Sequence, residues 1–270
     1  MKNIKLVAAD MDHTLLTEKG ELPPNFSEYV NKLDELGVCF TIASGRPLFT
    51  LQSTFSNIKD KMAFISDNGG CVCYHGEIIY TNIIEYEKYR ELIEFVEEET
   101  KGIAILCGLD TTYISSKYIE YEVFFRKFYT SLKFSDNLRE VNCLVDKFTI
   151  FFPDKDSKPH YEKIFKPKFG NDFNVTVGDA IWVDIMNKGV DKGAAMRVLG
   201  NELGITSSQM MAFGDTYNDI EMLEAVEFSY IVANAADEMK KYAKYITASN
   251  DEYGVTKVLD ELIETRCNTD

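Results

Sequence analysis

Two acidic residues stand directly after an apolar segment near the start of the chain. Asp10 and Asp12 follow residues 6–9, an apolar run that lacks a helical period. Such a run predicts a strand buried on both faces, which places the two carboxylates at its carboxyl end. In open α/β sheets, that edge is where ligands bind. By itself, an Asp-x-Asp sequence at a strand end is more often a solvated loop or a helix cap.

Polar side chains also follow other predicted strands of the same kind. They are Ser44, Gly45 and Arg46 after the segment 38–43, Asn68 after 62–65, Lys192 at the start of a helix that Asp191 can cap, and Asp215, Asn218 and Asp219 after 210–213. If these strands are neighbours in one parallel sheet, their carboxyl ends bring the polar groups together. Each motif alone has a plain structural explanation, such as a turn or a surface lysine. Their order along one chain favours a functional site.

The charges of this predicted cluster determine what it could hold. Two carboxylates about 4 Å apart repel by roughly 4 kcal/mol at an effective dielectric constant of about 20, so the cluster requires a cation. The three histidines lie far apart in the sequence, which favours oxygen ligands and therefore magnesium. A hard cation beside a lysine at a helix N-terminus and small hydroxyl and amide donors suits a phosphate group.

Two carboxylates one residue apart can divide the work of phosphoryl transfer. An ionised carboxylate can attack phosphorus, which splits a difficult reaction into two easier steps. A second carboxyl group, if protonated, can donate its proton to the leaving alcohol and later take one from water. Asp10 and Asp12 have the residue type and the spacing for this chemistry.

The composition limits the partners of the chain. Its 270 residues are 45% hydrophobic, enough for a large core, and carry a formal net charge of -15. The negative charge argues against nucleic acid or an anionic membrane as a partner. We expect neither a signal peptide nor a membrane span, because the chain goes almost directly into a strand and has no apolar run of about 20 residues. Six scattered cysteines favour reduced thiols, so we expect a cytoplasmic protein, as a monomer or small homo-oligomer.

The elements that must position these residues alternate regularly at both ends of the chain. Strand, helix and strand repeat through residues 1–83, and the pattern resumes over 187–270. Between them, residues 84–186 combine a long charged helix with several short strands. The expected helix is 85–100, and the expected strands are 103–106, 147–152, 173–177 and 181–184. This pattern predicts an α/β fold, in which a Rossmann-like parallel-sheet core is interrupted by an inserted α+β domain.

Four segments together are specific enough to indicate a family. They are Asp-Met-Asp-His-Thr-Leu-Leu at 10–16, Ser-Gly-Arg at 44–46, Lys-Gly at 192–193 and Gly-Asp-Thr-Tyr-Asn-Asp at 214–219. In order and spacing they resemble the four motifs of the haloacid dehalogenase superfamily. The insertion resembles, by position and size, the type IIB cap of its Cof-type phosphatases. One position departs from the pattern, because His13 stands where the family commonly has glycine.

The resemblance implies a role for each matching residue. Asp10 is the expected nucleophile, which becomes an aspartyl phosphate, and Asp12 is the expected general acid and base. The residues expected to bind phosphate or substrate are Ser44, Gly45, Arg46, Asn68, Lys192 and Asn218. Those expected to bind magnesium are Asp10, the main-chain carbonyl of Asp12, and Asp215, with Asp219 supporting them. His13 is expected to be a tolerated loop substitution without a catalytic role.

The sequence therefore predicts a magnesium-dependent phosphatase of small phosphorylated metabolites, with sugar phosphates as the first choice. A phosphomutase on the same scaffold is one alternative, and a phosphate-responsive regulatory protein is another. Asp12 and the large insertion argue against the regulatory alternative, because a slow switch needs neither a turnover acid nor an enclosed substrate. In the insertion, Trp182 and the aromatic residues of 124–129 are expected to form core, and the lysines of 155–168 a solvated face.

Overall fold

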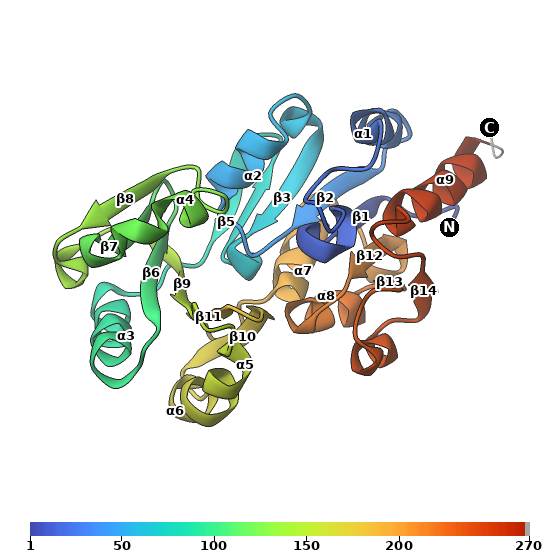
Figure 1. Cartoon of the computed structure of the whole chain (residues 1–270). Helices are drawn as coiled ribbons and strands as arrows, with labels where there is room; N and C mark the ends of the chain where they lie inside the picture. Colours follow the sequence, from blue (N-terminus) through green and yellow to red (C-terminus); the bar gives the residue numbers. More distant parts are fainter. Residues whose placement is uncertain (268–270) are drawn as a thin grey trace.

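The structure, a computed structural model, describes residues 1–267 and contains two β-sheets (Figure 1). The larger sheet has the strand order β14-β13-β12-β1-β2-β3-β4-β5. Its strands are β1 (Leu6–Ala9), β2 (Cys39–Ala43), β3 (Met62–Ser66), β4 (Cys71–Tyr74), β5 (Glu77–Thr81), β12 (Met210–Gly214), β13 (Phe228–Val232) and β14 (Tyr245–Thr247). Pairing is parallel from β14 to β3 and antiparallel at β4 and β5. The strand β1 thus lies in the middle, between strands from the two ends of the chain.

Helices cover both faces of this sheet. On one face lie α1 (Phe26–Glu35), α2 (Leu48–Thr54) and α9 (Gly254–Cys267). On the other face lie α7 (Lys192–Leu203) and α8 (Ile220–Ala225). The central strands are apolar on both sides because each side packs against helices, as their sequence predicted. We call this sheet with its helices the core; it is the Rossmann-like part of an α/β fold.

The second sheet, with the order β10-β11-β9-β6-β7-β8, lies beside the core (green and yellow in Figure 1). Its strands are β6 (Ile103–Gly108), β7 (Thr112–Ser115), β8 (Leu132–Ser135), β9 (Val145–Phe151), β10 (Phe173–Asp179) and β11 (Trp182–Asn187). The helices of this region are α3 (Tyr86–Glu99), α4 (Glu122–Phe125), α5 (Ser157–His160) and α6 (Lys166–Phe169). We call this inserted α+β unit the cap. Its exact limits, 84–186, stay a prediction.

The start of α7 shows how local sequence positions the site. The Asp191 side chain accepts a hydrogen bond from the N–H of Ala194 at 2.6 Å, so that the helix begins at Lys192 as predicted. The next residue must be small, because a Cβ at Gly193 would lie 2.2 Å from the carbonyl oxygen of Glu221. Glycine therefore lets the first turn of α7 approach the segment that follows β12.

The remaining expectations concern membranes and thiols. Within residues 1–267, every helix is too short or too polar to cross a membrane. In the same part of the chain the six cysteines form no disulfide, and Cys71 and Cys73 pack in the apolar core.

Candidate active site

The carboxyl ends of β1 and β12 meet the N-terminus of α7 around Lys192. This side chain is 0% exposed, and its ammonium donates hydrogen bonds to Asp10 at 2.6 Å and to Asp219 at 2.7 Å. The N–H of Asp10 continues the strand pairing by donating to the carbonyl of Phe213 at 2.9 Å. Two residues 182 positions apart, Asp10 and Lys192, are thereby in direct contact.

A third carboxylate lies beside this group. Asp215 accepts a hydrogen bond from the hydroxyl of Thr14 at 3.0 Å. The second oxygen of Asp219 accepts hydrogen bonds from the N–H groups of Asp215 at 3.0 Å and of Thr216 at 3.2 Å. Oxygens of Asp10, Asp215 and Asp219, which we call the acidic cluster, all lie within 4.8 Å of one another. Among the described residues, donors reach both oxygens of Asp219 but only one oxygen of Asp10 and of Asp215.

When ionised, the three carboxylates of the acidic cluster carry more negative charge than the single ammonium of Lys192 can balance. Burial raises the pKa of Asp10 well above its usual value; Lys192 opposes this, while Asp219 and Asp215 add to it. Burial and the charge of Asp219 raise the pKa of Asp215 to about 7. Burial disfavours the Lys192 ammonium, but Asp10 and Asp219 outweigh it and raise the pKa of the lysine. An all-oxygen donor set with excess negative charge fits a hard divalent cation such as magnesium.

The carboxylate of Asp12 is held by Arg46. The Nε of Arg46 donates to one oxygen at 2.9 Å and Nη2 donates to the other at 2.7 Å. The same guanidinium lies 5.2 Å from the ring centre of Phe128 and donates to the carbonyl of Lys127 at 3.2 Å, both in the cap. The hydroxyl oxygen of Ser44 accepts the N–H of Arg46 at 3.1 Å, which leaves its own proton free to be donated. Arg46 therefore connects the acid–base candidate with the cap.

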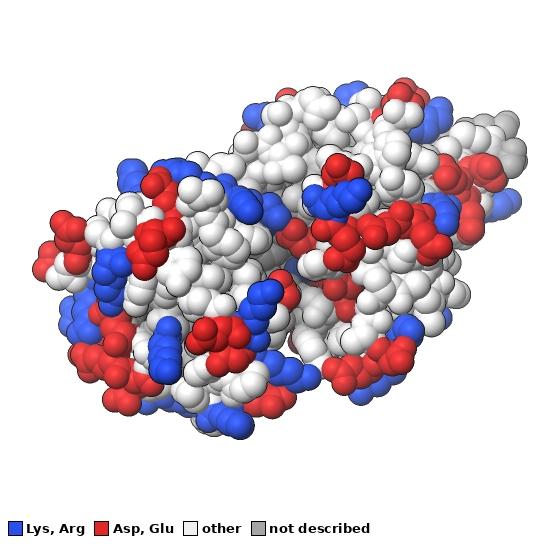
Figure 2. Space-filling model, in the orientation of Figure 1, with Lys and Arg blue, Asp and Glu red and all other residues white. Residues whose placement is uncertain are grey.

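A cavity of about 420 Å³ opens onto these groups between core and cap. The predicted site residues that line it are Asp10, Asp12, Ser44, Gly45, Arg46, Asp215 and Asn218. The other predicted residues, Asn68, Lys192 and Asp219, are buried behind this lining. Figure 2 shows the surface hollowed between the two lobes, with basic and acidic side chains along the border of the hollow.

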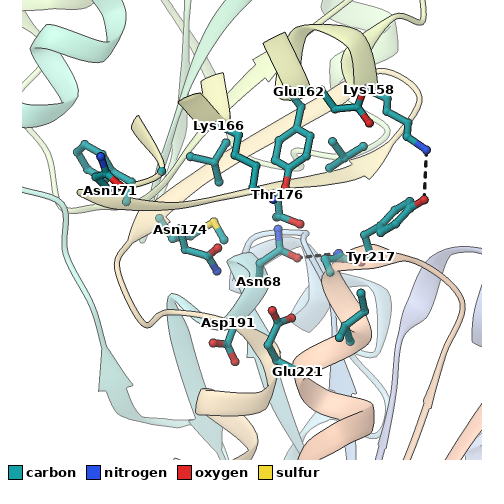
Figure 3. A pocket seen from close by; sticks show the side chains of 18 of the residues that line it. Asn68, Lys158, Glu162, Lys166, Asn171, Asn174, Thr176, Asp191, Tyr217 and Glu221 are labelled. Atoms are coloured by element: carbon teal, nitrogen blue, oxygen red, sulfur yellow. Dashed lines mark hydrogen bonds between the residues drawn. The ribbon is translucent and has the colours of Figure 1, made fainter. Parts of the chain in front are cut away.

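Asn68 lies behind Asn218, and both ends of its amide are engaged. The Nδ2 of Asn218 donates to the Oδ1 of Asn68 at 2.9 Å, and the Nδ2 of Asn68 donates to Asp184 of the cap at 2.7 Å. The two asparagines also border a second cavity, of about 640 Å³, which is enclosed by cap residues such as Lys166 and core residues such as Glu221 (Figure 3). The pair of amides thus separates the two cavities.

The cap contributes residues to the first cavity that the sequence analysis did not single out. They include Lys147 and Thr149 of β9, Asp179 of β10 and Asp184 of β11. Trp182 and Phe128, which were expected in the cap core, pack together with their rings 5.3 Å apart but also line the cavity. A signal was present, because Lys147 and Thr149 alternate with apolar residues along β9 and so lie on one face of the strand.

A buried charged group joins β9 to the core. The Lys147 ammonium donates to the carbonyl of Gly45 and lies 3.3 Å from Asp67. The neighbouring Asp146 is 0% exposed, and neither of its carboxyl oxygens has a hydrogen-bond donor within residues 1–267. Burial raises the pKa of Asp67 to about 6, and burial with the charge of Asp67 raises that of Asp146 well above its usual value. The raised pKa values favour protonation of this pair, which would relieve the repulsion between the two carboxylates.

His13 has a backbone conformation that favours glycine. Its φ is 62°, in the left-handed region, and its carbonyl accepts a hydrogen bond from Asn234 at 2.8 Å. The ring nitrogen Nδ1 lies 3.1 Å from the carboxylate of Glu18. Partial burial lowers the pKa of His13, but the hydrogen bond and charge of Glu18 outweigh this and raise it overall. The ring is therefore engaged with an exposed glutamate.

Comparison with known proteins identifies the family. The family model of the haloacid dehalogenase-like hydrolases matches residues 7–259. The 5-amino-6-(5-phospho-D-ribitylamino)uracil phosphatase YbjI of Escherichia coli (strain K12) is 29% identical over 265 residues, which cover 97% of each chain. The crystal structure of SMU.1108c from Streptococcus mutans UA159 has a TM-score of 0.90 and 29% identity, and the match covers 97% of this chain and 99% of that one.

The fold of a subclass IIB member is also shared. The sugar phosphatase BT4131 of this subclass has a TM-score of 0.78 at 22% identity, with 96% of this chain and 98% of that one covered. These matches extend over both core and cap, and they confirm the expected fold class and the expected phosphatase class of enzyme. The chain belongs to the haloacid dehalogenase-like hydrolases, and it shares the fold of a subclass IIB member of that group.

Proposed function

We propose that the chain is a magnesium-dependent phosphatase that hydrolyses small phosphorylated metabolites through an aspartyl phosphate on Asp10. The observation that carries the proposal is the buried contact of Lys192 with Asp10 and Asp219, next to Asp215. This group combines a carboxylate nucleophile, an ammonium donor and an all-oxygen site for a cation. Phosphoryl transfer depends on such positioning and charge stabilisation.

Asp10, Asp215 and the main-chain carbonyl of Asp12 would hold the magnesium ion. When bound, the ion neutralises negative charge on the phosphoryl oxygens. Asp219 is better suited to holding its loop, because both of its oxygens already accept hydrogen bonds. The hydroxyl of Thr14 orients Asp215.

In the first step, a carboxylate oxygen of Asp10 attacks phosphorus and the bond from phosphorus to the leaving oxygen breaks. Donors around the phosphoryl group are the hydroxyl of Ser44, the ammonium of Lys192 and the amide of Asn218. Asp12 delivers a proton to the leaving alcohol. Because Arg46 binds both oxygens of Asp12, the carboxyl group has to exchange this partner for the leaving oxygen first.

In the second step, water attacks the phosphorus of the aspartyl phosphate. Asp12, now a carboxylate, takes a proton from this water, and the bond from phosphorus to the Asp10 oxygen breaks. Inorganic phosphate leaves and Asp10 is restored as a carboxylate. The same side chain thus acts as acid and then as base.

Sugar phosphates are the first substrates that we propose. A cavity of about 420 Å³ suits a small molecule. The Escherichia coli relative is named for a phosphorylated ribityl chain on an aminouracil, and BT4131 is named a sugar phosphatase. The cytoplasmic location and the monomer or small homo-oligomer expected from the sequence stay predictions.

The test measures phosphate release from a panel of sugar phosphates, nucleotides and cofactor phosphates. The wild type is expected to release phosphate with magnesium and to stop when the ion is chelated. Asp10→Asn is expected to lower kcat by about 10³-fold or more, because the nucleophile is lost. Asp136→Asn, the same change at an exposed cap position, serves as the matched control.

Three results would contradict the proposal. If Asp10→Asn released phosphate as fast as the wild type, the aspartyl phosphate would be wrong. If a folded wild type consumed a phosphorylated sugar without releasing phosphate, the phosphomutase alternative would be favoured. No reaction with any compound, together with stable phosphorylation of Asp10, would favour the regulatory alternative.

A further inference from the structure

A chain of hydrogen bonds connects the cap to the cavity wall of the core. Asp184 of β11 accepts a hydrogen bond from the Nδ2 of Asn68 at 2.7 Å, and the Oδ1 of Asn68 accepts one from the Nδ2 of Asn218 at 2.9 Å. The exposed fractions of Asp184, Asn68 and Asn218 are 5%, 1% and 9%. Figure 3 shows Asn68 with this second bond at the centre of the view. We call these three residues the relay.

The carboxylate of Asp184, at the cap end of the relay, determines which atom donates and which accepts in both hydrogen bonds of the relay. An ionised carboxylate only accepts hydrogen bonds, so Asn68 has to turn its Nδ2 toward Asp184. The Oδ1 of Asn68 then faces Asn218, which has to present its own Nδ2. The hydroxyl of Thr149 donates to the other oxygen of Asp184 at 2.6 Å and so holds the carboxylate in place. The orientation of two core amides is therefore set from the cap.

The immediate surroundings of Asn218 do not favour this orientation. Its Oδ1 is buried and has no hydrogen-bond partner in the described part of the chain. A buried polar atom without a partner costs free energy, so fold stability alone does not select the arrangement. This orientation is useful because it leaves the second proton of the Asn218 Nδ2 available for donation at the cavity. Phosphoryl oxygens are acceptors, and they need a donor at this position.

We propose that Asp184 is a positioning residue which, through Asn68, turns an N–H of Asn218 toward the phosphoryl group. The inference rests on the proposed function, in which Asn218 donates to that group. Asp184 belongs to the cap, while Asn68 and Asn218 belong to the core, so the relay exists only when β11 lies against the core. Closure of the cap and completion of the phosphate site are therefore one event.

The first variant is Asp184→Asn. An amide at position 184 can present a donor to Asn68, which releases both core amides from their fixed orientation. We expect kcat to fall by about 10- to 100-fold, as for a donor lost from a developing charge. The KM should rise by no more than about 10-fold, because binding of the phosphoryl group is weakened while contacts with the leaving group are retained. The matched control is Asp136→Asn, whose kcat should stay within about 2-fold of the wild type.

The second test exchanges the amide at position 68 and the carboxylate at position 184. In Asn68→Asp alone, two carboxylates face each other and the donor to Asp184 is lost, so kcat should fall at least as far as in Asp184→Asn. In the double variant, the amide at 184 donates to the carboxylate at 68, whose other oxygen still accepts from Asn218. The number of charges is that of the wild type. We expect the double variant to have a higher kcat than either single variant. If the two substitutions acted independently, their fold-losses in kcat would multiply and the double variant would be the slowest of the three.

Binding of inorganic phosphate gives a readout that does not depend on turnover. Calorimetry with magnesium present should show a dissociation constant about tenfold higher in Asp184→Asn, with recovery in the double variant. Thermal unfolding, followed by circular dichroism, checks that each protein is folded. If Asn68→Asp fails to fold, the comparison of Asp184→Asn with the double variant decides the question alone.

The outcomes separate this inference from the proposed function. If the wild type binds phosphate in the expected pattern but releases none from any ester, the relay stands and the proposed function is wrong. If the wild type hydrolyses esters but the double variant is no better than the worse single variant, the relay is overturned. A wild type that does not bind phosphate overturns both.

Discussion

At the scale of single residues, a variant of His13 can distinguish a strained but tolerated loop residue from one that takes part in the reaction. Its φ of 62° favours glycine, and its ring contacts Glu18 at 3.1 Å. We expect His13→Gly to keep kcat within about 3-fold of the wild type, because the ring is hydrogen-bonded to Glu18 and, among the described residues, to neither Asp10 nor Asp12. Unfolding free energy should change by less than about 1 kcal/mol, since relief of strain is offset by the greater freedom of the unfolded chain.

The pH dependence of the rate is the measurement that decides this point. If His13 is only a tolerated loop residue, the wild type and His13→Gly give the same profile. Loss of a titration near pH 6 to 7 in the variant would show that the imidazole takes part in the reaction.

Some residue contacts could be predicted from the sequence and others could not. Asp10 and Lys192 were predictable because a strand end and a helix start determine where each lies, and neighbouring strands then bring them together. The partner of Arg46 was not, because a long side chain can reach in several directions and its contact with Asp12 depends on the turn at 44–46. The bond from Asn68 to Asp184 crosses between the sheets, and no local pattern indicates it.

At the scale of elements, the cap strand β11 presents Trp182 to the cavity. Its ring packs with Phe128 at the cavity wall, where the leaving group of a substrate would lie. We expect Trp182→Ala to raise the KM for an aryl phosphate by about 3- to 10-fold, because ring contacts of this kind contribute about 0.5–1.5 kcal/mol. The KM for acetyl phosphate, which has no ring, should stay within about 2-fold.

Trp182→Phe is the matched control for this prediction. It keeps a flat ring at the same position, so steady-state kinetics should give a KM for the aryl phosphate near the wild-type value. Equal losses for both substrates in Trp182→Ala would instead indicate a general disturbance of the cap and contradict a role in binding the leaving group.

Two of the strands that the sequence failed to indicate share a physical property. The strands β8 and β14 lie at sheet edges, and β14 is mostly exposed. Short edge strands bury little surface and carry no long apolar run, so their sequence resembles that of a loop. The central strands β1, β3 and β12 were predictable because burial on both faces demands continuous apolar residues.

At the scale of the whole molecule, the Asp67–Asp146 pair makes the junction of cap and core sensitive to pH. Burial raises the pKa of both carboxyl groups, that of Asp67 to about 6. The folded state therefore holds protons that the unfolded state releases, and stability falls as pH rises from about 4 through the raised values. Asp146→Asn supplies a donor at every pH, so we expect it to stabilise the protein at pH 8 by on the order of 1–3 kcal/mol.

Urea unfolding at several pH values tests the predicted fall in stability with rising pH. The advantage of Asp146→Asn should shrink as pH is lowered from 8 toward 4, because the wild type then regains its own proton. A constant difference, or one that grows at low pH, would contradict protonation of this pair. The exposed Asp136→Asn should show no such trend.

The central position of β1 has a consequence for synthesis of the protein. A ribosome makes Asp10 first, but its partner Lys192 comes 182 residues later, and Asp215 follows Thr14 by 201 residues. The strands of the cap lie between them in sequence and contact mainly one another. A nascent chain can thus complete its cap while Asp10 still lacks Lys192, Asp215 and Asp219. On the proposed mechanism, hydrolytic activity begins only after translation has passed the last of these residues, and we expect an interrupted polypeptide to be inactive.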